Sequence, residues 1–512
     1  MTDTVAGAPS EVAFAAVYES GRAQLLWRRL IDDLETPVSA YLKIAHGKPY
    51  AFLFESVEGG AWRGRYSIIA MNPDLVWRCR GERAEIARGD EGSLGDFNPE
   101  AVGSLESLRN LIASSRMEIP EGLPPMAGGI FGVLGYDIAR LAERLPNVNP
   151  DPLGLPDAVM IRPSIVAVFD AIAQEIVLIT TVRPGPQSPE QAFAAAQTRL
   201  DAVVADLAKP LPGSARPNEN TKPADPLASP VDRGAYGEMV DKAKAYIRAG
   251  DIFQVVPSHR FAMPFARDPF ALYRSLRRTN PSPFLFYLAY PEFTLVGSSP
   301  EILVRLRDGK ITIRPIAGTR RRGVTPAEDL ALEAELLADE KERAEHLMLL
   351  DLGRNDVGRV AMLRDEGRNS QVVPPRVRVT ESFKIERYSH VMHIVSNVEG
   401  DAPEGLDPVD VLMAALPAGT LSGAPKLRAM EIIDELESTK RGVVYGGAVG
   451  YFGADGSVDT CIVLRTGLIK DGVLHVQAGG GVVADSDPDA EYEETLHKSR
   501  ALARAAAEAW RF

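Results

Sequence analysis

The sequence predicts an α+β fold, in which antiparallel sheets pack under helices. Three Asp-Gly pairs, at residues 308–309, 455–456 and 471–472, each separate two apolar or β-branched runs. An Asp-Gly pair in that setting is a signal for a β-hairpin, whose two strands are antiparallel. Helical patterns occur among these hairpins, at residues 326–350 and 425–437. A mixture of hairpins and helices of this kind is typical of the α+β class.

The chain divides at a proline-rich stretch that we expect to be a linker. Six prolines lie among Gly, Ser and Asn residues between positions 209 and 230, and such a segment does not hold regular structure. Ser229 then provides an N-cap, with Pro230 at the first helical position, for a helix that we expect to end at Gly250. We therefore predict an N-terminal domain at 1–208, a linker at 209–230 and a C-terminal domain at 231–512.

Composition restricts the classes of protein that the chain can belong to. Its 512 residues are 45% hydrophobic and 25% charged, and its formal net charge is −13, which argues against a nucleic-acid surface. Its two cysteines, Cys79 and Cys461, offer neither a disulfide framework nor zinc-site spacing. We find no signal peptide in the first 20 residues and no apolar run long enough to span a membrane, so a cytoplasmic location is expected.

Two Glu-x-x-Glu pairs predict a site for a hard metal ion. Glu342 and Glu345 lie in one helical stretch, and Glu491 and Glu494 lie in another near the C-terminus. Residues three apart share a helix face, and four carboxylates on two facing helices are suitable oxygen ligands for Mg²⁺. A solvated acidic face is the alternative for each pair taken alone. An apolar stretch after the first pair, at 347–350, favours burial of that helix.

Three glycines stand immediately before the second acidic pair. Gly479, Gly480 and Gly481 end a strand-like run, and glycines in that place let a ligand approach backbone N–H groups closely. A bulge or tight turn is the alternative. The dinucleotide pattern that these glycines loosely match is rejected, because no second parallel strand follows. The P-loop-like stretch at 419–426 is rejected too, because its glycine spacing is wrong.

Four further residues are candidates for binding or acid–base chemistry. Arg465 ends an apolar run, where it forms either a fork for a carboxylate or a structural ion pair. Tyr445 offers a phenolic donor beside small residues, although a buried tyrosine is more often structural. His393 and Glu301 are a possible base and acid, with a structural histidine as the alternative. Because no nucleophile elbow is present, the residues favour a metal-assisted elimination or substitution on a small carboxylate.

Seven motifs identify the family that the chain resembles. They resemble, in order, the chorismate-utilising enzymes, and most closely the large subunit of anthranilate synthase. The matching segments are DIFQVVPSHR (251–260), PIAGTRRRG (315–323), KERAEHLMLLDLGRNDVGR (341–359), SHVMHIVSNVEG (389–400), GTLSGAPKLRAMEIID (419–434), YGGAVGYF (445–452) and QAGGGVVADS (477–486). This resemblance implies antiparallel sheets packed as a sandwich with surrounding helices.

The resemblance also implies the role of each site residue. It implies a Mg²⁺ ion held by Glu345 and Glu494, with Glu342 and Glu491 completing the cluster, and the metal in turn holding the ring carboxylate of chorismate. It implies that carboxylates are bound by Tyr445, Arg465 and the backbone of Gly479, Gly480 and Gly481, and that Gly318 and Thr319 line the ring, Thr319 also being counted among the catalytic residues. It implies that Glu301 protonates the departing C4 hydroxyl while ammonia adds at C2, and that His393 takes part in the later loss of pyruvate.

Two positions separate this chain from the nearest rival activities. Ala317 stands where subunits that make aminodeoxychorismate usually have a nucleophilic lysine, and alanine cannot form a covalent adduct. Gln254 stands where isochorismate and salicylate synthases usually have a water-activating lysine. Both residues favour anthranilate synthesis. The alternatives are an aminodeoxychorismate or aminodeoxyisochorismate synthase component, and a non-catalytic tryptophan-sensing subunit, which the intact acidic set argues against.

A second set of residues predicts a regulatory pocket, and the resemblance also implies a partner. Glu55 and Ser56, together with Pro283, Phe284 and Leu285, are similar to the family's site for tryptophan as feedback inhibitor; Ser56 alone would be an ordinary hydroxyl. Tryptophan there is expected to bias a domain arrangement that closes the distant catalytic site. The chain shows no amidotransferase domain, so we expect a separate glutamine amidotransferase small subunit to supply the ammonia.

Overall fold

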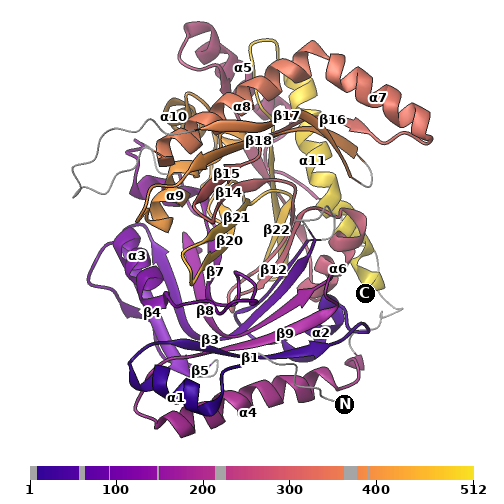
Figure 1. Cartoon of the computed structure of the whole chain (residues 1–512). Helices are drawn as coiled ribbons and strands as arrows, with labels where there is room; N and C mark the ends of the chain where they lie inside the picture. The colour runs from indigo at the N-terminus through magenta and orange to yellow at the C-terminus, as the bar shows by residue number, and fades with distance from the viewer. Residues whose placement is uncertain are drawn as a thin grey trace.

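A computed structural model of the chain shows a mixed fold of antiparallel sheets and helices, as the sequence predicts (Figure 1). The structure describes residues 8–56, 64–90, 93–146, 149–213, 227–361, 377–388 and 391–512. Of the predicted linker, 209–230, only the two ends are therefore described. Nearly all the strands belong to one hydrogen-bonded network, which splits into two runs that share the long strands β3 and β8.

The first run contains ten strands, each antiparallel to its neighbour. In spatial order they are β1 (Gln24–Ile31), β9 (Glu175–Val182), β8 (Ala158–Asp170), β3 (Tyr66–Arg80), β2 (Ala51–Glu55), β12 (Phe284–Ala289), β13 (Thr294–Ser299), β22 (Thr466–Lys470), β23 (Val473–Gly479) and β11 (Ser258–Pro264). Strand β2 from the N-terminal half thus pairs directly with β12 from the C-terminal half.

The second run continues from the other ends of β3 and β8. In spatial order it contains β4 (Arg83–Asp90), β3, β8, β7 (Gly129–Leu134), β20 (Ala448–Gly453), β21 (Val458–Ile462), β14 (Ile302–Arg307), β15 (Lys310–Ile313) and β18 (Val391–Asp401). Strands β16 (Ile316–Arg321) and β17 (Arg378–Arg387) also pair with β18. The short strands β5 (Ser93–Leu94) and β6 (Asn98–Pro99) pair with β4.

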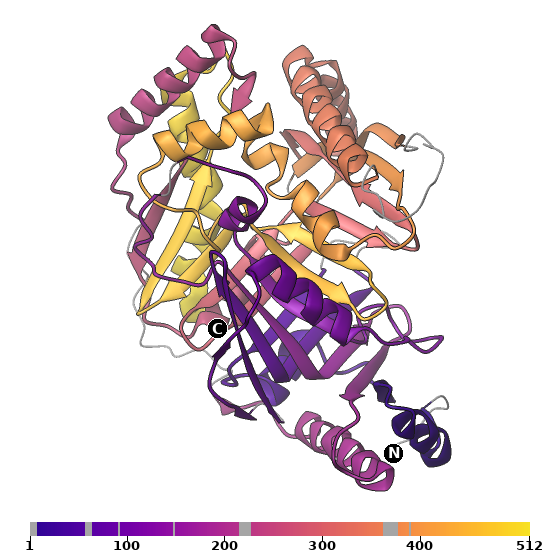
Figure 2. The same ribbon diagram turned by 90° about the vertical axis from the view of Figure 1, so that its left-hand side faces the viewer.

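A bulge allows one pair of strands to serve both runs. The register between β3 and β8 shifts between Pro73 and Leu75, and Asn72 beside it has φ of 52°. A bulge of this kind bends a strand and increases its twist. The first half of β3 therefore pairs with β2 and the second half with β4. In Figure 2 the indigo-to-magenta strands form the lower part of the molecule and the orange and yellow segments the upper part.

One hydrophobic core lies between the two runs, and helices cover their outer faces. Side chains of β1, β2, β9, β12 and β13 meet those of β7, β20 and β21 in one buried cluster. Outside the first run lie α1 (Glu11–Glu19), α2 (Pro37–Ile44), α4 (Pro189–Leu207), α6 (Pro269–Thr279) and α11 (Pro488–Glu508), followed by the 3₁₀ turn η4 (Ala509–Arg511). Outside the second run lie α3 (Ser104–Ser115), α8 (Glu340–Ala361) and α9 (Pro408–Ala415).

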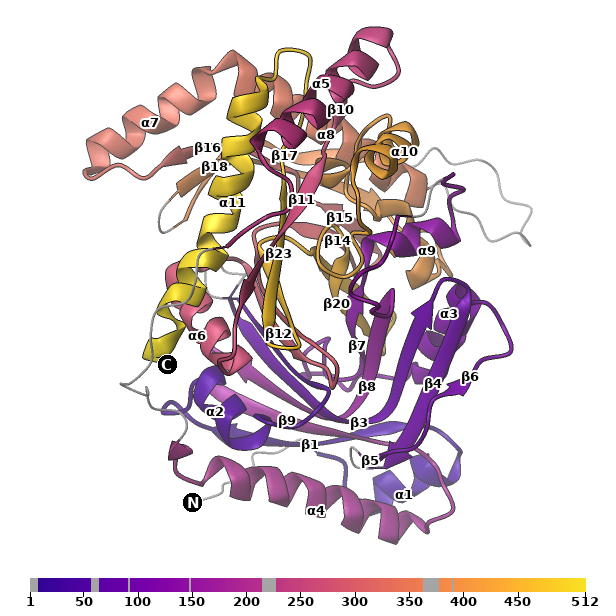
Figure 3. The same cartoon turned by 180° about the vertical axis from the view of Figure 1, so that it is seen from behind.

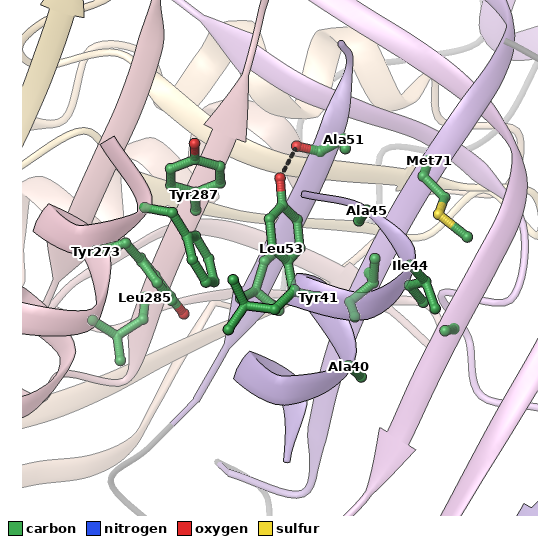
Figure 4. Close-up of a cluster of buried hydrophobic side chains, with 14 of the residues drawn as sticks. Ala40, Tyr41, Ile44, Ala45, Ala51, Leu53, Met71, Tyr273, Leu285 and Tyr287 are labelled. Carbon is green, nitrogen blue, oxygen red and sulfur yellow. Dashed lines mark hydrogen bonds between the residues drawn. The ribbon is translucent and has the colours of Figure 1, made fainter. Parts of the chain in front are cut away.

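The helices that cover the first run pack on it through apolar side chains, and buried polar groups such as the hydroxyl of Tyr41 form hydrogen bonds (Figures 3 and 4). Tyr41 of α2 packs among Leu53, Leu285 and Tyr287, and its hydroxyl donates to the carbonyl oxygen of Ala51 at 3.2 Å. A buried phenol usually needs such a partner, because a buried hydroxyl without one costs free energy. Figure 3 shows α4 lying along the bottom of the molecule beneath β1 and β9.

A smaller layer closes the end of the molecule where the glycine-rich strand β23 finishes. Helices α5 (Arg233–Ala249) and α10 (Lys426–Leu436) pack with the two-stranded pair β10 (Gln254–Val255) and β19 (Gly423–Ala424). The predicted stop at Gly250 is confirmed, since this residue caps α5 with φ of 84°. The predicted start is wrong, because Asp232 and not Ser229 caps the helix, accepting from the backbone N–H of Ala235. The turns η1 (Tyr136–Leu141) and η3 (Gly419–Leu421) lie in the connections around this layer.

The three predicted hairpins are confirmed, whereas two stretches that the sequence presents as continuous are each divided into two elements. The Asp-Gly pairs join β14 to β15, β20 to β21, and β22 to β23. The helix expected at 326–350 is instead two helices, α7 (Pro326–Ala338) and α8, because Asp339 is extended with ψ of 111°. The apolar stretch between the second and third Asp-Gly pairs is likewise two strands rather than one, because Arg465 has φ of 46° between β21 and β22.

Strands from the two sides of the predicted linker pair with each other twice, as β2 with β12 and as β7 with β20. The predicted division into domains remains a prediction. None of the helices in the described ranges combines the length and the apolarity that are needed to cross a bilayer.

The layered core yields a stability prediction. Phe52 of β2 is fully buried between the two runs, with its ring centroid 5.0 Å from that of Tyr290. We expect Phe52→Ala to lower the free energy of unfolding by about 3–5 kcal/mol, because it leaves a cavity in a close-packed core. Urea unfolding monitored by circular dichroism measures the change. Phe253→Ala is the matched control, since Phe253 is 72% exposed, and a comparable loss in both variants would contradict this account of the core.

Candidate functional site

The two acidic pairs begin two different helices that face each other across one site. Glu342 and Glu345 lie in the first two turns of α8, and Glu491 and Glu494 lie in the first two turns of α11. The N-terminus of a helix carries partial positive charge, which favours carboxylates there. The sequence folds this way locally because Asp487 caps α11 and Pro488 occupies its first position.

The charges of these carboxylates are only partly compensated. Burial raises the pKa of Glu345, and the carboxylates of Glu342 and Glu494 raise it further. Burial likewise raises the pKa of Glu491, although Ser486 donates to its Oε1 at 2.7 Å and opposes that shift. The other oxygen of Glu491, Oε2, is buried and has no hydrogen-bond partner in the described part of the chain. Carboxylates that raise each other's pKa in this way favour a cation between them.

Two basic side chains lie next to the acidic pairs. Arg320 contacts Glu342, with 3.2 Å between Nη1 and Oε1, and Lys498 contacts Glu494, with 2.7 Å between Nζ and Oε1. Within the described part of the chain, no three His, Cys, Asp or Glu side chains are gathered closely enough to hold a metal ion as they stand. The four glutamates thus share one neighbourhood, and the Mg²⁺ site predicted from them remains a prediction.

Glycines let the backbone approach these carboxylates closely. A Cβ added to Gly480 would lie 2.6 Å from Oε2 of Glu491, and one added to Gly318 would lie 3.2 Å from Oε2 of Glu342. Gly318 also has φ of 67° at a shift of register between β16 and β18, a backbone conformation that favours glycine. The predicted glycines therefore lie against the predicted metal ligands.

Glu301 is an acid held largely neutral at neutral pH. It is buried just before β14, and burial raises its pKa to about 8. The hydroxyl of Thr420 donates to its Oε1 at 3.3 Å, and with the charges of Arg465 and Lys498 it limits that rise. A carboxyl group with such a pKa can deliver a proton near pH 7.

His393 is held in one orientation on β18, across from β16. Its Nδ1 lies 3.0 Å from the carbonyl oxygen of Gly318 and 3.1 Å from Oγ1 of Thr319. Because a carbonyl oxygen only accepts, this contact assigns the ring proton to Nδ1 and leaves Nε2 as the basic nitrogen. Burial lowers the pKa of His393, and the charge of Arg465 lowers it further. The imidazole is therefore neutral near pH 7 and able to accept a proton.

Arg465 is the charge that both groups experience. The positive charge of its guanidinium lowers the pKa of both Glu301 and His393. Its backbone carbonyl accepts a hydrogen bond from the backbone N–H of Ser298 at 3.2 Å. Tyr445 is buried, and burial raises the pKa of its phenol. The predicted residues Glu301, His393, Thr319, Arg465 and Tyr445 thus belong to the same site as the glycines and the acidic pairs.

Lys498 and Thr420 were missed by sequence reasoning. The charge of Lys498 acts on Glu301, Glu345, Tyr445 and Glu491, and its Nζ donates to the carbonyl oxygen of Gly479 at 3.0 Å. Its position four residues after Glu494, on the same face of α11, was the available signal. For Thr420 we see no signal in the sequence, because its contact with Glu301 joins positions 119 residues apart.

Gln254 also reaches the glycine-rich corner. Its side chain is 3% exposed, and its Nε2 lies 2.5 Å from where a Cβ on Gly481 would be. Its Oε1 is buried without a partner among the described residues. Glutamine has no basic nitrogen, so it cannot activate a water molecule at this place.

The residues of the predicted regulatory pocket line one cavity between the two sheet runs. This cavity has a volume of about 120 Å³ and is lined by all five predicted residues, Glu55, Ser56, Pro283, Phe284 and Leu285, together with Tyr451 and Cys461 of the opposite run. Glu55 and Leu285 face each other across β2 and β12. The hydroxyl of Ser56 is buried and has no hydrogen-bond partner among the residues that the structure describes, whereas Glu55 pairs with Arg277 at 2.8 Å.

Comparisons with known proteins agree with this geometry. The family model of the chorismate binding enzymes matches residues 53–504. Anthranilate synthase component 1 of Cereibacter sphaeroides is 55% identical over 502 residues, which cover 98% of each chain. The component 1 protein of Thermus thermophilus is 46% identical over 480 residues, or 93% of this chain and 96% of the relative.

Solved structures show the same fold. The crystal structure of anthranilate synthase component I from Streptococcus pneumoniae superposes with a TM-score of 0.71 at 34% identity, covering 93% of this chain and 98% of that chain. The menaquinone-specific isochorismate synthase from Escherichia coli has a TM-score of 0.67 at 20% identity, covering 95% and 94%, and shows the fold alone. The chain belongs to the chorismate-binding enzyme family, and both relatives compared above are anthranilate synthase component 1 proteins.

Proposed function

We propose that this chain converts chorismate and ammonia to anthranilate and pyruvate, as the first component of an anthranilate synthase in tryptophan biosynthesis. The observation that carries the proposal is the pairing of a neutral carboxyl group, Glu301, with a neutral imidazole, His393, around a single guanidinium, that of Arg465. An amination followed by an elimination needs an acid and a base at different bonds of one anionic substrate, and these three groups supply them.

Each step is assigned to groups of the chain. Arg465 and Tyr445 bind carboxylate oxygen atoms of chorismate, and the backbone N–H groups at Gly479–Gly481 add further donors. Glu301 gives its proton to the C4 hydroxyl as that group leaves and ammonia adds at C2. In the second step His393 takes part through Nε2 as a proton is lost, pyruvate leaves and the ring becomes aromatic. Thr319 holds the imidazole in the orientation that this transfer needs.

A metal ion completes the proposal. The fit rests on burial and on neighbouring carboxylates, which raise the pKa of Glu345 and Glu491 and so disfavour their charged forms unless a cation is present, and on Oε2 of Glu491, which has no hydrogen-bond partner among the described residues. Glu345 and Glu494, with Glu342 and Glu491, would hold Mg²⁺, a hard cation that prefers carboxylate oxygen. When bound it supplies positive charge for the ring carboxylate of chorismate.

Two residues favour anthranilate over the rival products. Ala317 is buried in β16 and offers no nucleophile, and Gln254 beside Gly481 offers no base. Ammonia is then the group that adds to the ring. We propose that a glutamine amidotransferase subunit supplies it and that tryptophan inhibits the reaction from the cavity that Ser56 and Leu285 line.

The proposed reaction and its metal are tested together. The purified chain with chorismate, ammonium and Mg²⁺ is expected to form fluorescent anthranilate, and an aminated product that is not aromatic would favour a rival instead. Glu494→Gln should lower kcat/KM by about 100-fold or more, because several kcal/mol of charge stabilisation are lost. It should also weaken Mg²⁺ binding, measured by calorimetry with chorismate present.

Glu493→Gln is the matched control for the metal. Glu493 lies next to Glu494 on α11 but pairs with Arg233 at the surface. This variant should keep wild-type activity and Mg²⁺ binding. Equal effects of the two substitutions would remove Glu494 from the proposed site.

The pH dependence of kcat/KM tests the role of Glu301. The protonated form is the active one, so kcat/KM should fall as the pH rises through the pKa of about 8. Thr420→Val removes a donor that stabilises the carboxylate, so the falling limb should move to higher pH, whereas Thr420→Ser should leave it in place. Rates at a fixed concentration of free ammonia give the profile, and an unmoved limb in Thr420→Val would exclude Glu301 as this acid.

Inhibition by tryptophan tests the regulatory pocket. Ser56→Leu adds apolar bulk to the cavity between the sheets, so tryptophan should need an at least about 10-fold higher concentration for half-inhibition, corresponding to roughly 1.4 kcal/mol. The value of kcat/KM for chorismate should stay within about two-fold of wild type, since Ser56 lies outside the catalytic site. Unchanged inhibition would place the inhibitor elsewhere.

A further inference from the structure

A fully buried ion pair lies behind the catalytic site. Glu437 follows the last residue of α10, and Arg441 stands four residues later; their side chains are 3% and 2% exposed. Nε of Arg441 donates to both carboxylate oxygens of Glu437, at 3.1 and 3.0 Å. Removing two charges from water is costly unless further hydrogen bonds satisfy the remaining donors and acceptors.

In this pair, the remaining donors of Arg441 and the remaining acceptor capacity of Glu437 bind the backbone of other segments of the chain. Nη1 of Arg441 donates to the carbonyl oxygen of Leu421 at 2.7 Å, and Nη2 donates to that of Val256 at 2.6 Å. Oε1 of Glu437 accepts from both the backbone N–H and the hydroxyl of Ser258, each at 2.8 Å. The pair therefore ties η3 and the segment 256–258 to the loop after α10.

Each of these segments carries part of the site. Leu421 follows Thr420, which donates to Glu301. Ser258 packs against the end of β23, where a Cβ on Gly479 would lie 2.8 Å from that of Ser258. Val256 lies two residues after Gln254, which faces Gly481. A displacement of any one segment would therefore move a group that contacts the substrate or its acid.

The guanidinium also touches Tyr445 directly. Arg441 lies over the ring of Tyr445, at 5.2 Å from its centroid, and over the ring of Tyr136 of η1, at 4.7 Å. A cation near an aromatic face is attracted by the ring's electron density. The backbone N–H of Tyr136 donates to the carbonyl oxygen of Gly442 at 2.9 Å, so η1 and the loop that carries Tyr445 are also held together.

We propose that Glu437 and Arg441 are a positioning pair, which sets the places of Tyr445, Thr420 and Gly479 for chorismate through the directions of their hydrogen bonds. This inference rests on the proposed function. The planar fork of arginine reaches a carboxylate and two carbonyl oxygens in fixed directions while its face packs on the rings, which neither lysine nor an apolar side chain can reproduce.

A role in stability alone makes a different prediction. Replacing both members of a buried ion pair by apolar side chains of similar size is often neutral or stabilising. If the pair only holds the fold, such a replacement leaves substrate binding intact. If the pair positions the site, binding is lost while the fold keeps its stability.

The decisive experiment uses the double variant Glu437→Met/Arg441→Met in the full chain. We expect its melting temperature to equal or exceed that of the wild type. We expect KM for chorismate to rise about 10-fold or more, with a smaller fall in kcat, because Tyr445 and Gly479 contact the bound substrate while Thr420 acts through Glu301. Calorimetry with chorismate and Mg²⁺, without ammonium, should show a matching rise in Kd.

Two further variants serve as comparisons. Arg441→Lys keeps the charge but not the fork, so it should raise KM in the same direction and by less. Arg428→Met is the control on the helix that precedes the pair, α10, since Arg428 forms ion pairs with Asp251 and Glu431 at the surface. It should leave KM, kcat and Kd within about two-fold of the wild type.

A stable double variant that binds chorismate within about two-fold of wild type would overturn the proposal. If the double variant does not fold, a folded Arg441→Lys variant with wild-type KM would overturn it as well. Should the wild type make no anthranilate, the proposed function fails, and the binding comparison still decides whether the pair positions the site.

Discussion

The antiparallel pairing of β3 with β8 is the constraint on which the rest of the structure depends. Both strands are long, and the bulge near Pro73 bends β3 so that each end of the pair begins a different run of strands. The two runs bury a common core, and their outer faces each take a layer of helices. Strands from both halves of the chain are then brought together, which places β16, β18, α8 and α11 around one site.

Within that site, burial gives Glu301 and His393, the two groups proposed to transfer protons, opposite shifts of pKa. Burial acts in opposite directions on a carboxyl group and an imidazole, since it disfavours the charged form of each. Glu301 is thereby kept protonated and His393 kept neutral over the same range of pH. Arg465 and Lys498 supply positive charge around them, and the acidic pairs supply negative charge on the other side. An acidic protein can in this way bind a dianion without a basic surface.

Much of this arrangement could be predicted from local sequence signals. The Asp-Gly hairpins, the stop at Gly250 and the capping of α11 depend on residues close to one another in the chain. The break at Asp339 and the left-handed Arg465 could not, because there tertiary contacts override a continuous pattern. The contact of Thr420 with Glu301 and the reach of Arg441 to Val256 join residues more than 100 positions apart. Single-sequence periodicity does not carry that information.

The position of the second cavity has a mechanical consequence. It lies inside the layered core, between β2 and β12 on one side and β20 and β21 on the other, and at about 120 Å³ it is smaller than the roughly 300 Å³ of an ordinary small-molecule pocket. A ligand that fills it contacts strands of both layers at once. Strand β21 ends three residues before Arg465, so any shift of that strand on ligand binding would be applied next to the guanidinium whose charge acts on both Glu301 and His393.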